Sequence, residues 1–396
     1  MKITKKKKIC FVTDFNSIDS TLHTHKYLIN KLINNFSKVY FINSKQFDIF
    51  PENKDYRIKN NNKNIHLLKI KNKKEFKKFF KDNNCIIINN FGKKFGELYL
   101  HYLIKKNKIK QIQVLNTDPV SYSRRHETII SKWIYFFSRV IISRFTTILA
   151  ICNIISKIDI CFTTKKYLIN QQKNKIRENF RFVKKYILIN CLAHDDCKDF
   201  KFKKSTKHIL YIDYNVNHKD NISNRGILNE QLKKKHYQRV NKFLDKIKKL
   251  YKQNIIISIH PDYSLNDTKK NLPGYKIIKH QTIKLISKAS LIIFFNSTVL
   301  TYAFLMRKKM INLKSYILGM NCVLETGLYS HYSGVPIFDI NNEFKLTKPK
   351  LNKLLNSSKN KNELFVKKHL QPDNNNNGVD KIIRYLRKYN FSNLSK

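Results

Sequence analysis

Residues 254–315 carry the pattern that decides the fold, and their sequence is NIIISIHPDYSLNDTKKNLPGYKIIKHQTIKLISKASLIIFFNSTVLTYAFLMRKKMINLKS. Three short apolar runs, at 255–259, 289–295 and 310–313, alternate in this stretch with polar turns and segments of helical periodicity. Each run has the length of a buried strand, and the spacing is typical of β-α-β units. The stretch therefore predicts a parallel sheet with helices packed on its faces.

Polar residues follow the first two predicted strands at the points where the strands end. His260 and Pro261 follow the first strand, and Asn296, Ser297 and Thr298 follow the second and open the next helix. Ligands of open α/β sheets bind at this edge. Hydroxyls and free backbone N–H groups at a helix N-terminus bind phosphate, although plain helix capping is the alternative role. The pattern therefore predicts a site for a phosphate-bearing small molecule.

Strand–helix alternation extends over most of the chain and predicts two doubly wound α/β domains. Further strands are expected at 8–12, 39–42, 65–69, 85–88, 111–116, 158–162, 186–190 and 208–213, with helices at 20–36, 95–104, 229–252, 349–355 and 378–389. The expected division is a first Rossmann-like domain over 1–192, a linker over 193–206 and a second Rossmann-like domain over 207–370. An Asn-rich loop and a C-terminal helix that packs back on the first domain occupy 371–396.

The composition is that of a globular protein with an extreme positive charge. The chain has 396 residues, 42% hydrophobic, and a net charge of +52 from 79 Lys+Arg against 27 Asp+Glu. Such a charge indicates nucleic acid or an anionic membrane surface as a partner. Lysine is, however, spread over the whole chain together with Asn and Ile, as A+T-rich codons would produce, and no nucleic-acid-binding motif is recognised. We therefore expect no specific nucleic acid and keep an anionic membrane surface as a partner.

The cysteines indicate a reducing compartment. There are seven, an odd number, and no two are spaced as C-x-x-C. Most lie in apolar runs, where free cysteine packs as a small hydrophobic residue. Cys191, His194 and Cys197 lie close together in sequence without an evident fourth ligand. The pattern predicts neither disulfides nor a structural zinc site, and it favours the cytoplasm.

No segment has the pattern of a signal peptide or a spanning helix. The N-terminal apolar run covers only 9–12, too short for a signal sequence. The most apolar segment, 133–162, is interrupted by charged residues, and no uncharged stretch reaches the ~18 residues that spanning needs. We expect a buried helix followed by a strand. The alternative is a helix lying on the inner face of the cytoplasmic membrane, because Trp133 and its aromatic neighbours adjoin Arg139 and Arg144.

Several of these pieces resemble GT-B glycosyltransferases. The matching pieces are ILYID at 209–213, IHP at 259–261, the link and helix over 279–293, the S-T-x-x-x-x-A pattern at 297–303, and KKMI at 308–311, where relatives carry gKPvi. The second half is similar, more narrowly, to bacterial capsule and lipopolysaccharide sialyltransferase-like proteins and to polyglycerophosphate-type transferases. The resemblance implies two Rossmann-like domains facing a cleft, and transfer of a sugar to a glycan or lipid-linked acceptor of surface-polysaccharide assembly.

The resemblance also implies roles for individual residues. His260, held by Pro261, would donate a hydrogen bond to the phosphate of a nucleotide-sugar donor, and Asn296, Ser297 and Thr298 would bind the same phosphate. Lys279 would approach the nucleotide, and Asp213 would bind ligand or cap the loop after its strand.

The acceptor hydroxyl needs a general base from the first domain. Asp14 and Asp118 follow predicted strands there and are the catalytic candidates, with an ordinary loop role as the alternative for each. No D-x-D motif is present, so the expected mechanism is metal-independent and needs no cofactor beyond the nucleotide-sugar substrate.

The chain departs from the family pattern in two respects. Lys309 replaces the usual proline, and only 8 glycines are present, with no Gly-rich phosphate loop and no recognisable acidic catalytic motif. A nucleotide-sugar epimerase on the same fold, a nucleic-acid-binding protein and an inactive relative therefore remain as alternatives.

Overall fold

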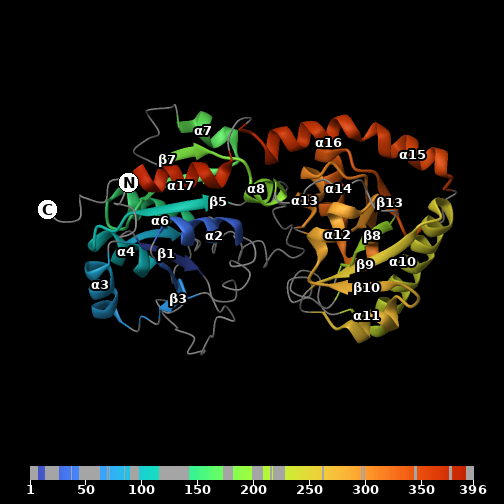
Figure 1. The fold of residues 1–396 in the computed structure, drawn as a ribbon, viewed down its shortest axis with the longest axis horizontal. Coiled ribbons are helices and arrows are strands. Elements are labelled where there is room, and N and C mark those ends of the chain that lie inside the picture. Colours follow the sequence, from blue (N-terminus) through green and yellow to red (C-terminus); the bar gives the residue numbers. More distant parts are fainter. Residues whose placement is uncertain are drawn as a thin grey trace. The chain divides into compact units, whose positions relative to one another are not determined.

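The computed structural model describes residues 8–13, 26–36, 38–43, 63–68, 70, 72–83, 85–89, 98–115, 142–172, 182–198, 208–214, 216, 228–260, 263–295, 297, 299–342, 346–373 and 377–388. These residues form two compact units (Figure 1). Unit 1 contains the described residues up to Asp195 and again from Gln371 onward, and unit 2 contains those from Asp196 to Leu370. The division falls inside a helix, α8 (Leu192–Lys198), within the segment 193–206 where the sequence predicts a linker.

Unit 1 is built on a parallel sheet of seven strands in the order β3-β2-β1-β4-β5-β6-β7. Their bounds are β1 Lys8–Thr13, β2 Lys38–Asn43, β3 Ile65–Leu68, β4 Cys85–Asn89, β5 Gln111–Leu115, β6 Ile158–Thr163 and β7 Val183–Leu188. Strands β4 and β6 are buried at every position, which explains their continuous apolar sequence. The order runs outward from β1 to β3 and then reverses at β4, as in a doubly wound sheet.

The helices of unit 1 cover both faces of this sheet. They are α2 Lys26–Asn35, α3 Lys73–Asp82, α4 Leu98–Lys106, α6 Ile142–Ile151, α7 Lys166–Gln172, α8 and α17 Gly378–Lys388. Helix α6 and strand β6 confirm the helix-then-strand expectation for the described part of 133–162. Six of the seven cysteines are buried, as expected for cysteines that pack as small hydrophobic residues.

The C-terminal helix α17 completes unit 1, which confirms the prediction that it packs back on the first domain. Val379, Ile382, Ile383 and Leu386 recur at helical spacing and join the core that includes Ile9 and Phe11 of β1 and helix α2.

Polar contacts fix the start of α17. The carboxylate of Asp195, which is fully buried, accepts from the backbone N–H of Val379 at 2.6 Å. The side chain of Asn190 pairs with the backbone of Asp373 at 2.8 and 2.9 Å. Segments almost two hundred residues apart in sequence are thereby joined.

Unit 2 is built on a second parallel sheet, in the order β10-β9-β8-β11-β12-β13. Its strands are β8 His208–Ile212, β9 Asn254–Ile259, β10 Lys276–Lys279, β11 Leu291–Phe294, β12 Met310–Lys314 and β13 Ile337–Asp339. The apolar runs at 255–259, 289–295 and 310–313 thus form β9, β11 and β12, as predicted. Strand β8 lies between β9 and β11, and both β10 and β13 lie outside the predicted strands.

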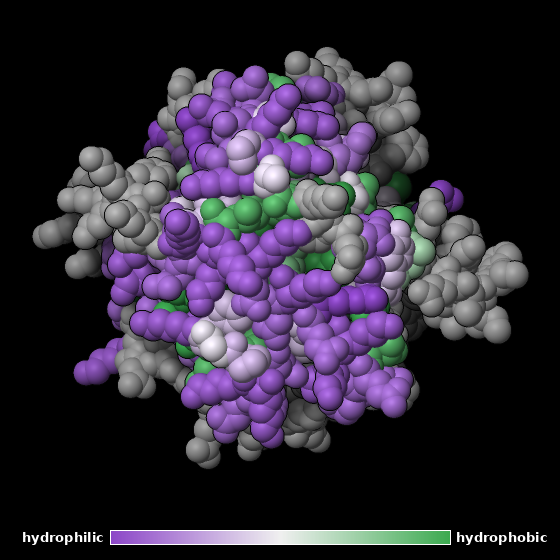
Figure 2. Space-filling view, turned by 90° about the vertical axis from the view of Figure 1, so that its right-hand side faces the viewer, coloured by the Kyte–Doolittle hydropathy of each residue, from purple (hydrophilic) through white to green (hydrophobic). Residues whose placement is uncertain are grey.

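The helices of unit 2 are α10 Glu230–Tyr251, α11 Leu265–Asn271, α12 Thr282–Lys288, α13 Leu300–Leu305, α14 Met320–Ser333, α15 Lys348–Ser357 and α16 Lys359–Phe365, with short turns η7 Tyr316–Leu318 and η8 Val366–Leu370. Helix α10 begins where Asn229 caps the N–H of Leu232 at 2.8 Å and ends at Lys252 in a left-handed conformation. Its buried stripe, which includes Tyr237, Val240 and Leu244, confirms the predicted helix. The surface of unit 2 seen in Figure 2 is mostly hydrophilic, with apolar residues confined to a band and small patches.

Candidate functional site

The site is built at the carboxyl edge of the unit 2 sheet, where the strand order reverses. Strand β8 lies between β9 and β11. The sheet continues from β9 to β10 on one side, and from β11 to β12 and β13 on the other. A crevice forms at such a switch point because the connections leave toward opposite faces, and ligands of open α/β sheets bind there.

Strand register brings four of the predicted residues to this edge. Ile212 of β8 pairs with Ser258 of β9 and with Phe294 of β11, and Ile259 pairs with Lys279 of β10. Asp213, His260 and Ser297 each lie within three residues after their strand, and Lys279 is the last residue of its own. Residues that are up to 84 positions apart in sequence are thus gathered at one edge of one sheet.

His260 is exposed at the end of β9, and its backbone carbonyl accepts from the N–H of Tyr263 at 3.0 Å. This hydrogen bond closes a tight turn between β9 and α11. The ring therefore stands on the edge of the sheet, on a segment anchored at both ends by regular structure.

Asp213 is the most perturbed group of the site. Its side chain is 7% exposed, and the hydroxyl of Tyr211 donates to its Oδ1 at 3.3 Å. Burial raises the pKa of the carboxyl to about 7, although hydrogen bonds from Tyr211, Tyr237 and the backbone of Tyr214 oppose the shift. The second oxygen, Oδ2, is buried and has no hydrogen-bond partner among the residues that the structure describes. An unsatisfied buried oxygen at a switch point calls for an explanation, and a ligand group is one.

Three tyrosines connect Asp213 to the turn that carries His260. Tyr211 lies in β8, Tyr237 in α10, and the hydroxyls of Tyr237 and Tyr263 approach within 3.5 Å. Burial raises the pKa of all three phenols, so they stay protonated and act as hydrogen-bond donors across the working pH range. This buried network fixes the end of β8 relative to the β9–α11 turn.

Lys279 also supports this turn. Its ammonium donates to the backbone carbonyl of Tyr263 at 3.1 Å. One of its three N–H donors is thus used structurally. Its predicted contact with a nucleotide stays a prediction.

Ser297 does not cap the helix that follows it. Helix α13 begins at Leu300, and the position before it is Val299, which makes no side-chain capping bond. The expectation that Ser297 opens this helix is therefore wrong, because a turn closed by the N–H of Leu300 and the carbonyl of Ser297, 3.2 Å apart, intervenes. The hydroxyl of Ser297, which is half-buried, keeps its donor and acceptor capacity.

The other predicted site residues lie outside the described part of the chain. These are the catalytic candidates Asp14 and Asp118 and the donor-binding candidates Pro261, Asn296 and Thr298. Their roles stay predictions.

The structure adds residues that the sequence pattern misses. These are Tyr237 on α10, Tyr263 in the turn after β9, and the fully buried Ser315 after β12. The Oγ atom of Ser315 has no hydrogen-bond partner within the described part of the chain. Tyr211 alone had a local signal, because it precedes Asp213 by two residues and so shares its face of the strand. Tyr237 and Tyr263 reach the site only through packing of α10 and the β9–α11 turn.

The described residues contain neither a metal-ligating cluster nor a membrane-spanning helix. Within the ranges that the structure describes, no three His, Cys, Asp or Glu side chains lie close enough together to hold a metal ion. No helix in those ranges is long and apolar enough to cross a membrane.

Comparison with solved structures identifies the fold. The wall teichoic acid polymerase TagF superposes with a TM-score of 0.53 at 13% identity, over 99% of this chain and 91% of that chain. A second structure of TagF, with CDPG, gives 0.50 at 14% identity over 97% and 89% of the two chains. The UDP-GlcNAc 2-epimerase from Methanocaldococcus jannaschii gives 0.50 at 15% identity over 96% and 100%.

The fold is of the GT-B type. This confirms the predicted fold class of two Rossmann-like α/β domains. Identities this low carry information on the fold alone. The sequence matches no protein-family model and no curated protein.

Proposed function

We propose that this protein is a glycosyltransferase that moves a sugar from a nucleotide-activated donor to an acceptor of surface-polysaccharide assembly. The observation that carries the proposal is the gathering of Asp213, His260, Lys279 and Ser297 at the carboxyl edge of unit 2, around the switch point of a GT-B fold. Fold alone does not define chemistry, so the residues at this edge carry the functional argument.

The donor phosphates would bind at this edge. Departure of the nucleotide leaves negative charge on its phosphates, and fixed hydrogen-bond donors stabilise that charge. His260 and Ser297 supply an imidazole and a hydroxyl, and Lys279 supplies an ammonium. Asp213 would reach the ligand on a local opening of the strand end, because its Oδ2 is buried. Protonated, it would then donate to a phosphate oxygen, and ionised, it would accept from a ribose hydroxyl.

Transfer to the acceptor would need a general base. We propose Asp14 or Asp118 for this role, because each comes shortly after a strand of the unit 1 sheet in the sequence. The proposed mechanism relies on protein side chains and uses no metal or additional cofactor.

A nucleotide-sugar 2-epimerase is the second candidate, because the UDP-GlcNAc 2-epimerase from Methanocaldococcus jannaschii shares the fold over 96% of this chain. The two activities differ in one requirement. An epimerase forms product from the donor alone, whereas a transferase needs an acceptor.

Nucleotide binding tests the proposal. We would measure thermal unfolding with CMP, CDP, UDP, GDP and short oligonucleotides, for the wild type, His260→Ala and the control His331→Ala, a histidine on α14 of the same unit. A nucleotide at 100 times its dissociation constant stabilises the fold by about 2.7 kcal/mol. We expect stabilisation by one mononucleotide, reduced in His260→Ala and kept in His331→Ala. A response only to oligonucleotides that vanishes with salt would contradict the proposal and favour nucleic-acid binding.

We also propose that unit 1 docks on an anionic membrane, where a lipid-linked acceptor would be found. Helix α6 exposes Phe145 and Ile148, 45% and 54% accessible, and Ile154 follows at 50%. Helix α4 lies next to the residues that follow α6, because the carbonyl of His101 on α4 accepts from the N–H of Ser156 at 3.2 Å.

The same helix pair supplies the polar rim of this surface. On α4, Tyr99 and Tyr102 are exposed and Lys106 lies 5.7 Å from the ring of Tyr102. Aromatic and aliphatic side chains rimmed by lysine are typical of interfacial surfaces. Vesicle co-sedimentation tests this surface.

A further inference from the structure

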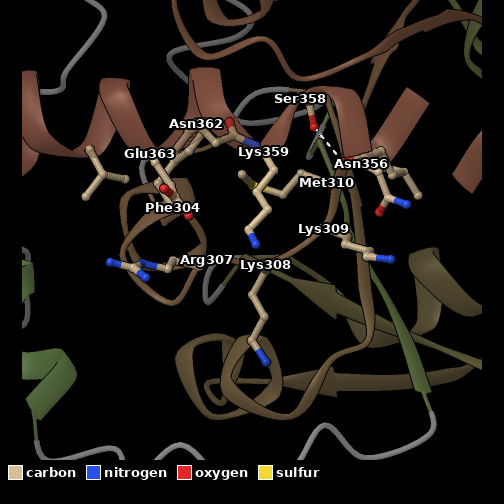
Figure 3. Close-up of a pocket in the computed structure, with 12 residues that line it drawn as sticks. Phe304, Arg307, Lys308, Lys309, Met310, Asn356, Ser358, Lys359, Asn362 and Glu363 are labelled. Atoms are coloured by element: carbon tan, nitrogen blue, oxygen red, sulfur yellow. Dashed lines mark hydrogen bonds between the residues drawn. The ribbon is translucent and has the colours of Figure 1, made fainter. Parts of the chain in front are cut away.

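A pocket of about 270 Å³ lies at the opposite edge of the unit 2 sheet from the candidate donor site. It opens where α13 ends and β12 begins, at Arg307–Met310, and helices α15 and α16 form its other wall (Figure 3). Strand β12 runs from this edge to the carboxyl edge, and its five residues span roughly 13 Å at ~3.3 Å per step. The pocket is therefore separate from the site around Asp213 and His260.

The pocket has an apolar floor. Phe304, Met310, Leu355 and Val366 line it from four different elements. The ring of Phe304 packs on that of Phe365 with centroids 4.7 Å apart, which fixes α13 against α16. The floor thus belongs to the packed core of the unit.

Two polar groups at the pocket are already engaged. The ammonium of Lys308 donates to the carbonyls of Ser287 and Ala289, at 2.7 and 3.1 Å, and so points away from the pocket as Figure 3 shows. This contact holds the C-terminal end of α12 and explains a lysine at this position. The hydroxyl of Ser358 donates to the carbonyl of Leu355 at 2.9 Å.

The remaining polar groups of the rim are available to a ligand. Arg307, Lys309 and Lys359 line the pocket, and among the residues that the structure describes no carboxylate lies within ion-pair distance of any of them. In Figure 3 the side chain of Lys359 extends from α16 toward the turn that carries the other two cations.

Two acceptors lie on α16 beside these cations. The Oδ1 atom of Asn362 is buried and has no hydrogen-bond partner among the described residues, and Glu363 contributes a carboxylate. A buried acceptor without a partner is costly, and a ligand hydroxyl would satisfy it once the Asn362 side chain turns into the pocket.

We propose that this pocket binds a small phosphomonoester that carries hydroxyl groups. The phosphate would lie at the ammonium of Lys359, because guanidinium and ammonium groups form charge-assisted hydrogen bonds with phosphate oxygens. The exposed side chains of Arg307 and Lys309, which point to opposite sides of Lys359 in Figure 3, would turn toward it. The hydroxyls would donate to Asn362 and Glu363. The volume is just below the ~300–1,000 Å³ of pockets for drug-sized ligands, so a ligand the size of glycerol phosphate fits and a whole nucleotide sugar does not.

The backbone at Arg307 offers a variant that separates binding from folding. Arg307 follows α13 with φ of 51°, in the left-handed region where glycine is favoured. Replacing it with glycine removes the cation and relaxes the backbone at once. Arg307→Gly should therefore fold at least as stably as the wild type and bind the phosphate ester less tightly.

Calorimetric titration of the full chain tests the proposal with three probes: glycerol 3-phosphate, inorganic phosphate and glycerol. We expect saturable binding of glycerol 3-phosphate, weaker binding of inorganic phosphate and none of glycerol. Arg307→Gly and Lys359→Met should each weaken glycerol 3-phosphate binding about tenfold. Asn362→Leu should abolish the preference for glycerol 3-phosphate over inorganic phosphate.

The control removes a positive charge next to the pocket without touching it. Lys353 is exposed on α15 and does not line the pocket, so Lys353→Met should leave binding unchanged. Equal weakening by Lys353→Met and Lys359→Met would overturn the proposal, because it would show general attraction to a cationic surface. Absence of saturable binding in the wild type would overturn it as well. Binding that His260→Ala weakens and Arg307→Gly does not would assign the phosphate to the carboxyl edge instead.

Discussion

Asp213→Asn makes the stability of unit 2 less sensitive to pH. The Asp213 carboxyl is buried under the switch point and its pKa is raised to about 7, from an ordinary value of 3.8. Asparagine has nearly the same shape, keeps an oxygen that accepts from Tyr211, and does not ionise. The substitution therefore removes the titration while preserving most of the packing.

The magnitude follows from linkage between protonation and folding. Between pH 3.8 and about 7 the folded protein holds a proton on Asp213 that the unfolded chain has lost, so stability falls as the pH rises through this window. Each pH unit costs about 1.4 kcal/mol. From pH 5 to pH 8 the wild type should lose roughly 3 kcal/mol that Asp213→Asn does not lose, since the loss levels off above the folded pKa.

The assay is thermal or urea unfolding of both proteins at several pH values from 5 to 8. All other titrating groups are shared, so the difference between variant and wild type isolates Asp213. A difference of roughly 3 kcal/mol corresponds to about 6–12 °C for a unit of this size. The control Asp267→Asn removes an exposed carboxylate nearby and should leave the slope unchanged. A variant advantage that stays constant or shrinks with rising pH would refute the reasoning.

Two further predictions concern unit 1. Gly378→Ala should destabilise the protein by about 1–3 kcal/mol, since a Cβ there would lie 2.7 Å from the backbone oxygen of Asn190. The control Gly327→Ala places its Cβ in open space on α14 and should be neutral or stabilising. Equal Tm values for the two variants would contradict this prediction. Replacing both Phe145 and Ile148 with glutamine should weaken binding to anionic vesicles about tenfold or more, because each half-exposed side chain contributes roughly 1 kcal/mol. The control Leu364→Gln on α16 should leave vesicle binding unchanged. Equal weakening by Leu364→Gln, or equally strong binding to neutral vesicles, would rule out this surface.

The fold was predictable where the apolar pattern was strong. Strands β9, β11 and β12 and helix α10 follow from continuous apolar runs and from a stripe of helical period capped by Asn229. Strand β10, with the sequence KIIK, and the three-residue β13 escape the pattern because they are short edge strands with half-exposed or exposed positions. Helix α14 has a weakly segregated apolar face, so its period carries little signal.

The candidate site was predictable in part, for a topological reason. Residues that follow parallel strands share one edge, so His260 and Ser297 could be assigned to one site before any contact was known. That β8 separates β9 from β11, and so places Asp213 between them, depends on strand order, which no local pattern encodes. The phenols of Tyr237 and Tyr263 depend in turn on how α10 packs, a further step from the sequence.

The lysine content has a structural use that changes the meaning of the net charge. Lys279 donates to the carbonyl of Tyr263, Lys308 to those of Ser287 and Ala289, and Lys381 to that of Leu188. The carbonyls of Ser287, Ala289 and Leu188 lie at the C-terminal end of a helix or strand, where cations are favoured, and that of Tyr263 lies in the turn before α11.

Ammonium groups engaged in this way keep their charge but are held in fixed positions. The cations on the rim of the 270 Å³ pocket differ from other surface lysines in position, because Arg307, Lys309 and Lys359 line one cavity. Placement around a cavity, and not the total number of lysines, is therefore the property that separates a ligand site from a compositional bias in this chain.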